Sequence, residues 1–285
     1  MAAPSPAFLS TVDLHTHSTA SDGSLAPAAV VQAAAEVGVQ MLALTDHDTV
    51  RGLDEAAAAA HRCGITLVPG VELSVRWKER SLHLVGLDID PAAPALVAGL
   101  AELQRIREIR AAGIAQRLER IGVHDALART QALAHGNQPT RTHFARLLVA
   151  DGICRDLERA FSRYLGAGKP AYVGAAWPEL DQAVDWIRRA GGQAVIAHPL
   201  RYRFGSQLRG RLYQAFREMG GAGIEVCCGT SDADDVRRSA NEAAEQGLKG
   251  SVGSDFHGPE QPWVRLGRVA PLPAKVDAVW ASSSA

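Results

Sequence analysis

Two histidines near the start of the chain have a spacing that could bind a metal ion. His15 and His17 follow a short apolar stretch, residues 12–14, that is typical of the end of a buried strand. On an extended backbone, side chains two residues apart leave on the same face, so both imidazoles could reach one ion. The polar run that follows ends in Asp22 and Gly23, which turns the chain and offers a carboxylate nearby. On its own, the pattern fits two solvated histidines as well as it fits a metal site.

Similar residues recur along the chain, mostly where predicted strands end, which is where α/β barrels place active sites. The set has six histidines and three carboxylates: His15, His17, Asp22, His47, Glu72, His83, His198, Asp255 and His257. This mixture of nitrogen and oxygen ligands suits Mn²⁺, Zn²⁺ or Fe²⁺ better than Mg²⁺ or Ca²⁺. Nine ligands are too many for one ion. We therefore expect two or three divalent ions, bridged by a carboxylate.

The elements that would position these residues alternate between short apolar strands and helices. Strands are expected at residues 41–45, 65–69, 81–88, 193–197, 223–226 and 249–253. Glu72 would follow the strand 65–69, whereas His83 would lie inside the next strand. Glu225 falls within the predicted strand 223–226, without an assigned role. This alternation predicts an α/β fold with a largely parallel sheet.

The alternation is interrupted by a helical segment at residues 101–170. Helices are expected at 97–121, 125–134, 141–150 and 157–165. The segment has 12 Lys/Arg and 7 Asp/Glu, a formal charge of +5, which leaves −6 for the rest of a chain whose total is −1. A basic insert beside an acidic barrel suits an anionic substrate, although arginine is also common on solvated helices. We expect a barrel from residues 1–100 and 171–285, with the insert 101–170 covering its active site.

Composition favours a cytoplasmic protein. The four cysteines have no Cys-x-x-Cys spacing, and Cys227 and Cys228 are adjacent, which does not suit an ordinary disulfide. Residues 1–10 contain no Lys or Arg and make a poor signal peptide. No apolar run is long enough to cross a bilayer. We expect neither a membrane nor a protein partner.

Five motifs together resemble those of the PHP superfamily, the polymerase and histidinol phosphatase phosphoesterases. In chain order they are His15-x-His17, Thr45-Asp46-His47-Asp48, Gly70-Val71-Glu72, Ala197-His198-Pro199 and Gly253-Ser254-Asp255-x-His257. The resemblance implies a distorted (β/α)7 barrel with a metal cluster at its mouth. It also implies three ligand sets, which are His15, His17, Glu72 and Asp255; Glu72, His83 and His198; and Asp22, His47 and His257.

Glu72 would then bridge two ions, with Mn²⁺ the preferred metal and Zn²⁺ or Fe²⁺ as alternatives. A hydroxide between the ions, held by the ligands Glu72, His198 and Asp255, would attack phosphorus. His198 could instead be a general acid. Asp13, Asp46 and Ser254 are expected to support the ligands through hydrogen bonds rather than to bind metal.

The helical insert resembles one branch of this family, which contains 3′,5′-nucleoside bisphosphate phosphatases and short-RNA 5′-exonucleases. The similar segments contain Arg107 and Arg110, Arg141-Thr142-His143, and Gly168-Lys169-Pro170-Ala171-Tyr172-Val173. The resemblance implies that Arg141, His143 and Lys169 hold the second phosphate of the substrate, with arginine binding through its bidentate fork. Arg201 and Tyr202, which follow His198, are further candidates for substrate binding near the metals.

The sequence thus predicts a metal-dependent phosphohydrolase that converts nucleoside 3′,5′-bisphosphates to 5′-nucleotides. A 5′-3′ exoribonuclease on short RNA is the closest alternative. A histidinol phosphate phosphatase is less favoured, because a basic insert has no evident use with a cationic substrate. A metal-binding regulatory module without catalysis is a fourth reading, which the complete set of ligands disfavours.

Overall fold

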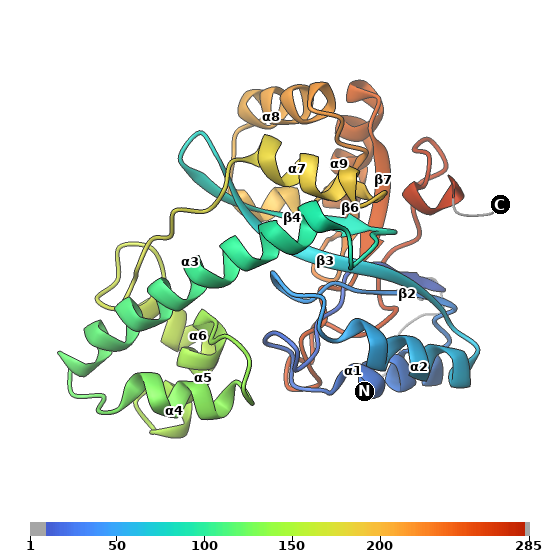
Figure 1. Cartoon of the computed structure of the whole chain (residues 1–285). Coiled ribbons are helices and arrows are strands. Elements are labelled where there is room, and N and C mark those ends of the chain that lie inside the picture. Colours follow the sequence, from blue (N-terminus) through green and yellow to red (C-terminus); the bar gives the residue numbers. More distant parts are fainter. Residues whose placement is uncertain (1–9, 283–285) are drawn as a thin grey trace. The chain divides into compact units, whose positions relative to one another are not determined.

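The chain divides into two compact units, and each is described by itself. The computed structural model describes residues 10–282. One unit combines Met1–Gly99 with Pro178–Ala285, and the other is Leu100–Trp177. Figure 1 shows the mixed helices and strands of the first unit and the all-helical character of the second. The helix α3 (Pro94–Glu119) contributes residues to both.

The first unit is built around a single seven-stranded sheet within residues 10–282, in which the strands follow one another in chain order. They are β1 (Val12–Asp13), β2 (Met41–Leu44), β3 (Thr66–Trp77), β4 (Arg80–Leu87), β5 (Gln193–Ile196), β6 (Gly223–Cys228) and β7 (Lys249–Gly253). Neighbouring strands are parallel except where β4 pairs with β3 and β5. The predicted α/β class with a largely parallel sheet is confirmed.

The sheet closes because the first and last strands meet. The Leu14 amide donates to the Val252 carbonyl at 2.9 Å, and the Asp255 amide donates to the His15 carbonyl at 2.8 Å. A parallel bridge between Thr16 and Phe256 extends this contact. The result is the expected distorted seven-stranded barrel, and its closure brings the two ends of the motif series side by side.

Helices on the outside of the sheet bury its apolar residues. In the first unit they are α1 (Pro27–Glu36), α2 (Leu53–Cys63), α7 (Leu180–Arg189), α8 (Ser206–Glu218) and α9 (Ala233–Gln246). One buried cluster packs α1 and α2 against β2, with Val30, Ala56 and Leu44 among its members. A second cluster joins side chains from successive strands, including Ala43 and Val195. None of the helices described between residues 10 and 282 is both long and apolar enough to span a membrane.

The strand expected at residues 65–69 is longer in the structure than in the prediction, so that it includes Glu72. The strand β3 continues to Trp77 and pairs antiparallel with β4, so Glu72 sits inside a strand rather than after one. A two-residue turn at Lys78 and Glu79, with φ of 47° and 61°, connects the pair. Such turns need two residues at positive φ and usually contain Asn-Gly or Asp-Gly. The Lys-Glu pair gave no such signal, and the hairpin was therefore not predicted.

The second unit is a small helical bundle with its own core. Its helices, besides the second part of α3, are α4 (Ala126–Leu133), α5 (Arg141–Ala150) and α6 (Leu157–Ala160), followed by a π-helical turn (Phe161–Leu165). Leu118, Phe144 and Leu148 are fully buried in this core. Thr140 caps α5, because its hydroxyl accepts from the Thr142 amide at 3.1 Å. The helices expected in this segment are therefore present.

Gly253 gives the first testable prediction, because no side chain fits where β7 meets β1. A Cβ atom there would lie 2.3 Å from the His15 Cβ and 2.8 Å from the His15 nitrogen. Gly253→Ala should lower the free energy of unfolding by about 1–3 kcal/mol, as overpacking does, and should displace His15. Gly210→Ala is the matched control, because it lies inside α8 with nothing within 4 Å. Urea unfolding followed by circular dichroism should show no loss for this control, and an equally stable Gly253→Ala would contradict the prediction.

Candidate metal centre

Four ligand-type atoms converge from the segments that follow β1 and β7 and from β3. His15 Nε2 and His17 Nε2 lie 3.1 Å apart, and each lies 3.3 Å from Glu72 Oε2. The Asp255 Oδ1 oxygen is 3.4 Å from His15 Nε2 and 3.2 Å from His17 Nε2. The extended backbone after β1 directs both imidazoles to one point, as the spacing of two predicts. These four residues are the first of the three ligand sets expected from the sequence.

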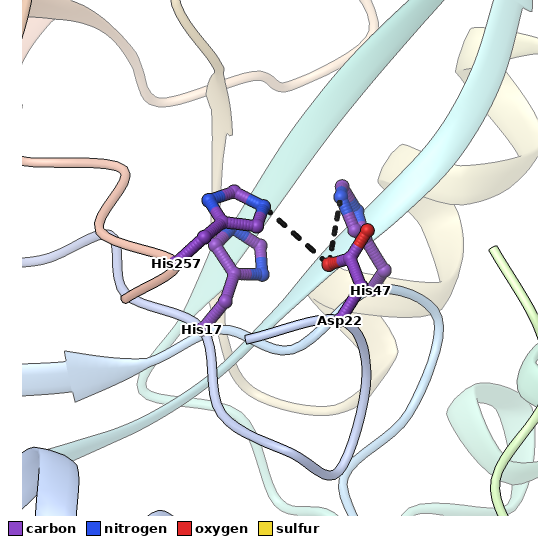
Figure 2. A group of neighbouring side chains, drawn as sticks. All are labelled: His17, Asp22, His47 and His257. Atoms are coloured by element: carbon purple, nitrogen blue, oxygen red, sulfur yellow. Dashed lines mark ion pairs between the residues drawn. The ribbon is translucent and has the colours of Figure 1, made fainter. Parts of the chain in front are cut away.

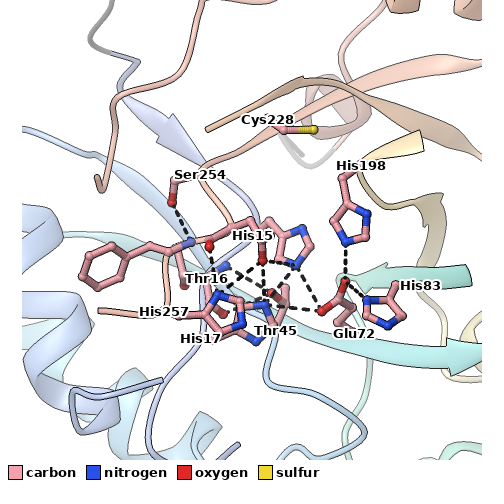
Figure 3. A network of polar contacts seen from close by, with 12 residues as sticks. His15, Thr16, His17, Thr45, Glu72, His83, His198, Cys228, Ser254 and His257 are labelled. Carbon is pink, nitrogen blue, oxygen red and sulfur yellow. Dashed lines mark hydrogen bonds and ion pairs between the residues drawn. The ribbon is translucent and has the colours of Figure 1, made fainter. Parts of the chain in front are cut away.

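Glu72 is the residue that joins this group to its neighbours. Its other oxygen, Oε1, lies 2.9 Å from His83 Nδ1 and 3.1 Å from His198 Nε2 (Figure 3). His83 reaches this point because β4 is antiparallel, so the beginning of β4 lies at the end of the barrel where the parallel strands finish. His47 Nδ1 also lies 2.9 Å from Glu72 Oε2. Glu72 therefore contacts both histidines of the expected second set. The ligand atoms that lie close enough together for one ion are those of Glu72, His83 and His47, without His198.

A third group gathers around Asp22, as Figure 2 shows. The Asp22 Oδ1 oxygen lies 3.4 Å from His257 Nε2 and 3.8 Å from His47 Nε2. The ring of His17 stacks against that of His257 with centroids 4.0 Å apart, and His17 belongs to this group as well as to the first. The structure thus brings the expected Asp22, His47 and His257 together and adds His17 to them.

The distances and the missing hydrogen bonds fit divalent metal binding. Ligands about 2.1 Å from one ion lie about 3.0 Å apart in an octahedral arrangement and about 3.4 Å apart in a tetrahedral one. The separations in the first group, 3.1 to 3.4 Å, have this size. Within residues 10–282, Glu72 Oε2 makes no hydrogen bond although it is buried and has imidazole nitrogens close by. Lone pairs directed at a shared cation explain this arrangement.

The charge state of the carboxylates also suits a cation. Burial favours the neutral form of Glu72, yet His83, His15 and His47 together hold the pKa of this carboxyl group well below its usual range. The pKa of Asp255 is likewise well below its usual value despite burial, because His15 and Arg201 lie nearby. Ionised carboxylates in this position are ready to bind divalent ions without a proton having to leave them.

Two ligands have strained backbones that other groups hold in place. His198 and Asp255 have φ of 30° and 57°, a region that residues other than glycine seldom adopt. The Glu225 carboxylate accepts a hydrogen bond from the His198 amide at 2.6 Å. The Asp255 amide is held by the His15 carbonyl. Such strain is found mostly at functional sites, where the surroundings fix it.

Glu225 is the functional candidate that the sequence did not single out. Its Oε1 oxygen lies 2.6 Å from His15 Nδ1, and its side chain is 1% exposed. A carboxylate on the second ring nitrogen fixes the tautomer of a metal-binding histidine and makes it a better ligand. The available signal was a glutamate within the apolar run Gly223–Cys228, since a buried charge needs a partner.

The residues expected to support the ligands act on the loops that hold them. Asp13 accepts hydrogen bonds from the Ser254 amide at 2.8 Å and the Gly267 amide at 2.9 Å. Asp46 accepts from the amide and hydroxyl of Ser18, at 2.8 and 2.6 Å, and from the Ser21 hydroxyl. Both aspartates are buried. They fix the segments that carry Asp255 and Asp22 through backbone amides and serine hydroxyls.

Arg201 and Tyr202 lie beside the ligands. Arg201 donates to the Asp255 carboxylate and, at 3.3 Å, to the Thr230 hydroxyl. The Tyr202 hydroxyl accepts from the His83 amide at 2.9 Å, and its ring lies 5.4 Å from that of His198. Arg201 is therefore well placed for a bound phosphate, whereas Tyr202 has a structural contact that holds β4.

The expected phosphate-binding residues of the insert fall into two groups within their own unit. Arg107 and Arg110 lie over the Trp177 ring, 5.6 and 5.4 Å from its centroid. Arg141, Thr142 and His143 form the first turn of α5, where the positive end of the helix dipole favours an anion. His143 is buried, and its Nδ1 accepts from the Thr140 amide at 3.1 Å, so part of its role is to cap the helix. Lys169 is exposed in the turn after the π-helical segment.

Comparison with known proteins gives close relatives over nearly the whole chain. A 3′,5′-nucleoside bisphosphate phosphatase of Chromobacterium violaceum is 45% identical over 275 residues, covering 95% of this chain and 96% of the relative. A 5′-3′ exoribonuclease of Haemophilus influenzae is 45% identical over 269 residues, covering 94% and 97%. A solved structure described as an amidohydrolase from Chromobacterium violaceum, with bound sulfate and no metal, is 44% identical, covers 95% of each chain and has a TM-score of 0.91.

A family model described as the PHP domain matches residues 13–170, which is more than half of the chain. The matched segment begins at the end of β1, just before the first histidine pair, and includes Glu72. The order of motifs noted in the sequence and the closed barrel that gathers their side chains agree with this match. On these grounds the chain belongs to the PHP domain family.

Proposed function

We propose that this protein is a divalent-metal-dependent phosphohydrolase that removes the 3′-phosphate from nucleoside 3′,5′-bisphosphates and leaves the nucleoside 5′-monophosphate. The observation that carries the proposal is the buried carboxylate of Glu72, whose two oxygens face histidines on either side within 3.3 Å. A carboxylate in this position suits two adjacent cations, and paired cations are common in phosphate-ester hydrolysis. The bisphosphate phosphatase named above, at 45% identity, supports the choice of substrate.

The proposed cluster holds two or three ions, and we favour Mn²⁺, with Zn²⁺ or Fe²⁺ as alternatives, because the ligands mix imidazoles and carboxylates. Its ligands are those of the three groups described above, namely His15, His17, Asp22, His47, Glu72, His83, His198, Asp255 and His257. Such ions supply hydroxide from water at neutral pH and neutralise the phosphoryl oxygens. Nothing in this ligand set argues for a regulatory module without catalysis.

The reaction breaks the bond between phosphorus and the ribose 3′ oxygen. Water attacks phosphorus, the 3′ oxygen departs and takes up a proton, and inorganic phosphate and the 5′-nucleotide are formed. Arg201, beside the ligand Asp255, would contact the reacting phosphoryl group. His198 remains a candidate for the proton donor, because its side chain is near Glu72 and is almost fully buried.

The second phosphate would be held by the basic residues of the insert. We assign it to Arg141, His143 and Lys169, with Thr142, Arg107 and Arg110 in support. The first turn of α5 suits a phosphate because the positive end of the helix dipole lies there and its first residue is the cationic Arg141. Binding energy from this phosphate can orient the other one for attack, which raises kcat as well as lowering KM.

A second candidate activity is 5′-3′ exoribonuclease action on short RNA. It is favoured by the relative from Haemophilus influenzae, which matches this chain as well as the phosphatase does. Both activities break the same kind of phosphorus–oxygen bond. A cytoplasmic location also remains our proposal, and it is supported by four cysteines that are free thiols.

The product formed from adenosine 3′,5′-bisphosphate tests which of its two phosphates the enzyme removes. With the Mn²⁺-loaded enzyme we expect 5′-AMP and inorganic phosphate, identified by chromatography and phosphorus NMR. Other common bases should be accepted, because the contacts proposed here are to phosphates. Plain 3′-AMP should react far more slowly, since it lacks the phosphate that orients the substrate. Release of adenosine 3′-phosphate, or a preference for histidinol phosphate, would refute the assignment.

Arg141 tests the role of the insert. Loss of one partner from a buried charge pair costs about 2–5 kcal/mol. Arg141→Ala should therefore lower kcat/KM on the bisphosphate by roughly 30- to 4,000-fold. The loss on p-nitrophenyl phosphate should be much smaller, because that substrate has no second phosphate. Arg120→Ala, an exposed arginine of the same insert, controls for net charge. Equal losses of Arg141→Ala on both substrates would mean that Arg141 supports the fold instead.

Glu225 tests the metal centre without an activity measurement. Glu225→Gln keeps the shape of the side chain but removes the negative charge that faces His15 Nδ1. We expect Mn²⁺ affinity to fall by roughly 10- to 100-fold, as changes behind a ligand usually cause. Isothermal titration calorimetry measures it, with Glu245→Gln on the exposed face of α9 as the control. Unchanged affinity in both variants would show that Glu225 does not orient His15.

A further inference from the structure

Both candidate substrates, the nucleoside 3′,5′-bisphosphate and short RNA, have a phosphate on the ribose 3′ oxygen. Only in RNA are further nucleotides attached to that phosphate. In a bisphosphate the 3′-phosphoryl group carries nothing more than oxygens. In RNA the same phosphoryl group carries the next nucleotide through its 5′ oxygen. A site that cleaves RNA therefore needs a path for the nucleotides beyond the reacting phosphate. The inference below rests on the proposed function and defines its substrate class.

A cavity of about 170 Å³ begins at the metal centre. His198 and Arg201 form one side of it, and both reach the metal cluster, His198 through Glu72 and Arg201 through Asp255. Thr230 and Ser231, from the loop between β6 and α9, line it as well. This wall is polar and offers hydroxyl groups, which suits a ribose better than an apolar ligand.

A second cavity of about 470 Å³ adjoins the first. The two share Cys228, Thr230 and Ser231, so the loop after β6 borders both of them. Gly229 in this loop sits against the strand end that precedes Asp255, because a Cβ atom on it would lie 2.2 Å from the Ser254 carbonyl oxygen. The two cavities thus lead in sequence away from the metal centre, and all their lining residues belong to the same unit.

Trp263 lines this second cavity and is not among the residues that line the first. Its side chain is 65% exposed, and it is the only large exposed aromatic residue in the part of the chain that the structure describes. Trp263 follows the ligand His257 by six positions. A nucleobase can stack on an exposed indole whatever its sequence. Arg268 lines the same cavity and is exposed, so its guanidinium can meet a backbone phosphate.

We propose that the two adjoining cavities bind the nucleotides that follow the reacting phosphate of a short single-stranded RNA. In this arrangement a base stacks on Trp263, and Arg268 contacts the phosphate next to it. The carboxylates that line the cavities have cations beside them. Arg201 and Arg238 line the first cavity with Glu225 and Asp235, and Arg268 lines the second with Asp232. Asp232 accepts from the Asp235 amide at 2.8 Å, and Glu225 is held by His15 and His198.

The chemistry is the same as for the bisphosphate. Water attacks phosphorus, the 3′ oxygen of the first nucleotide leaves and takes a proton, and a 5′-mononucleotide is released. The phosphate stays on the remaining chain as its new 5′-phosphate. That shortened chain occupies the proposed path, from which it can shift by one nucleotide and react again.

The test compares two substrates in one enzyme. Wild type and Trp263→Ala, both full-length and loaded with Mn²⁺, are assayed on a 5′-phosphorylated triadenylate and on adenosine 3′,5′-bisphosphate. Stacking of one base predicts that Trp263→Ala lowers kcat/KM on the trinucleotide, relative to the bisphosphate, by roughly 5- to 150-fold. The loss should appear mainly in KM. Trp263→Phe retains an aromatic face and should recover most of the lost kcat/KM. Arg265 is an exposed neighbour outside both cavities, so Arg265→Ala should leave the ratio of kcat/KM on the two substrates as in wild type.

Direct binding separates this inference from the proposed reaction. The anisotropy of a 5′-phosphorylated, 3′-labelled triadenylate is titrated with each full-length variant in chelator, where no cleavage occurs. Trp263→Ala should weaken binding, and Arg268→Ala should reduce the slope of log Kd against log salt by about 0.7. Equal effects of Trp263→Ala on both substrates, or no loss of RNA binding, would overturn the path. If wild-type enzyme hydrolyses neither substrate but binds RNA through Trp263, the proposed hydrolysis is wrong and the proposed RNA-binding path is still supported.

Discussion

A buried negative charge is the constraint on which this barrel depends. Glu72 has no exposed surface and lies inside a strand, where an unpaired carboxylate would be strongly destabilising. Histidines from four different segments surround it, and without metal some of them must carry protons. The negative groups around His15 raise the pKa of that imidazole well above its usual value although burial opposes this. Burial and the neighbouring His257 instead lower the pKa of His17 to about 3. Divalent ions would replace such protons, so metal binding and folding stability are linked.

The sequence was sufficient to predict which histidines and carboxylates gather at the end of the barrel, but not how all of them meet. Side chains at the ends of parallel strands gather at one end of a sheet, and this predicted His15, His47 and Asp255 well. Glu72 and His83 reach the same point through an antiparallel hairpin. The turn at Lys78 and Glu79 requires two positive φ angles, which the local residue preferences of Lys and Glu do not predict. Long-range pairing, rather than local propensity, determined this part of the fold.

The residues behind the ligands were harder to predict than the ligands themselves. Glu225 lies 210 positions from His15 in the sequence, and only the closed sheet shows that they meet. The insert presents the opposite difficulty. Its helices follow clear periodicity and were expected, whereas the function of its charged residues is not fixed by helix geometry. Arg107 and Arg110 over Trp177, and His143 at the cap of α5, each have a structural contact as well as a proposed role.

The contact between β1 and β7 has a consequence for how the protein matures. Asp13 and Ser254 are hydrogen-bonded across 241 positions of sequence, and the first ligand group needs residues from both of these ends. A chain still emerging from the ribosome cannot complete that group until the segment that carries Asp255 has been synthesised. Contacts of such long range also form late in folding, because loop closure must precede them. A metal ion held by this group would therefore arrive only after β7 has paired with β1, and it would be drawn from the ions available to the closed barrel.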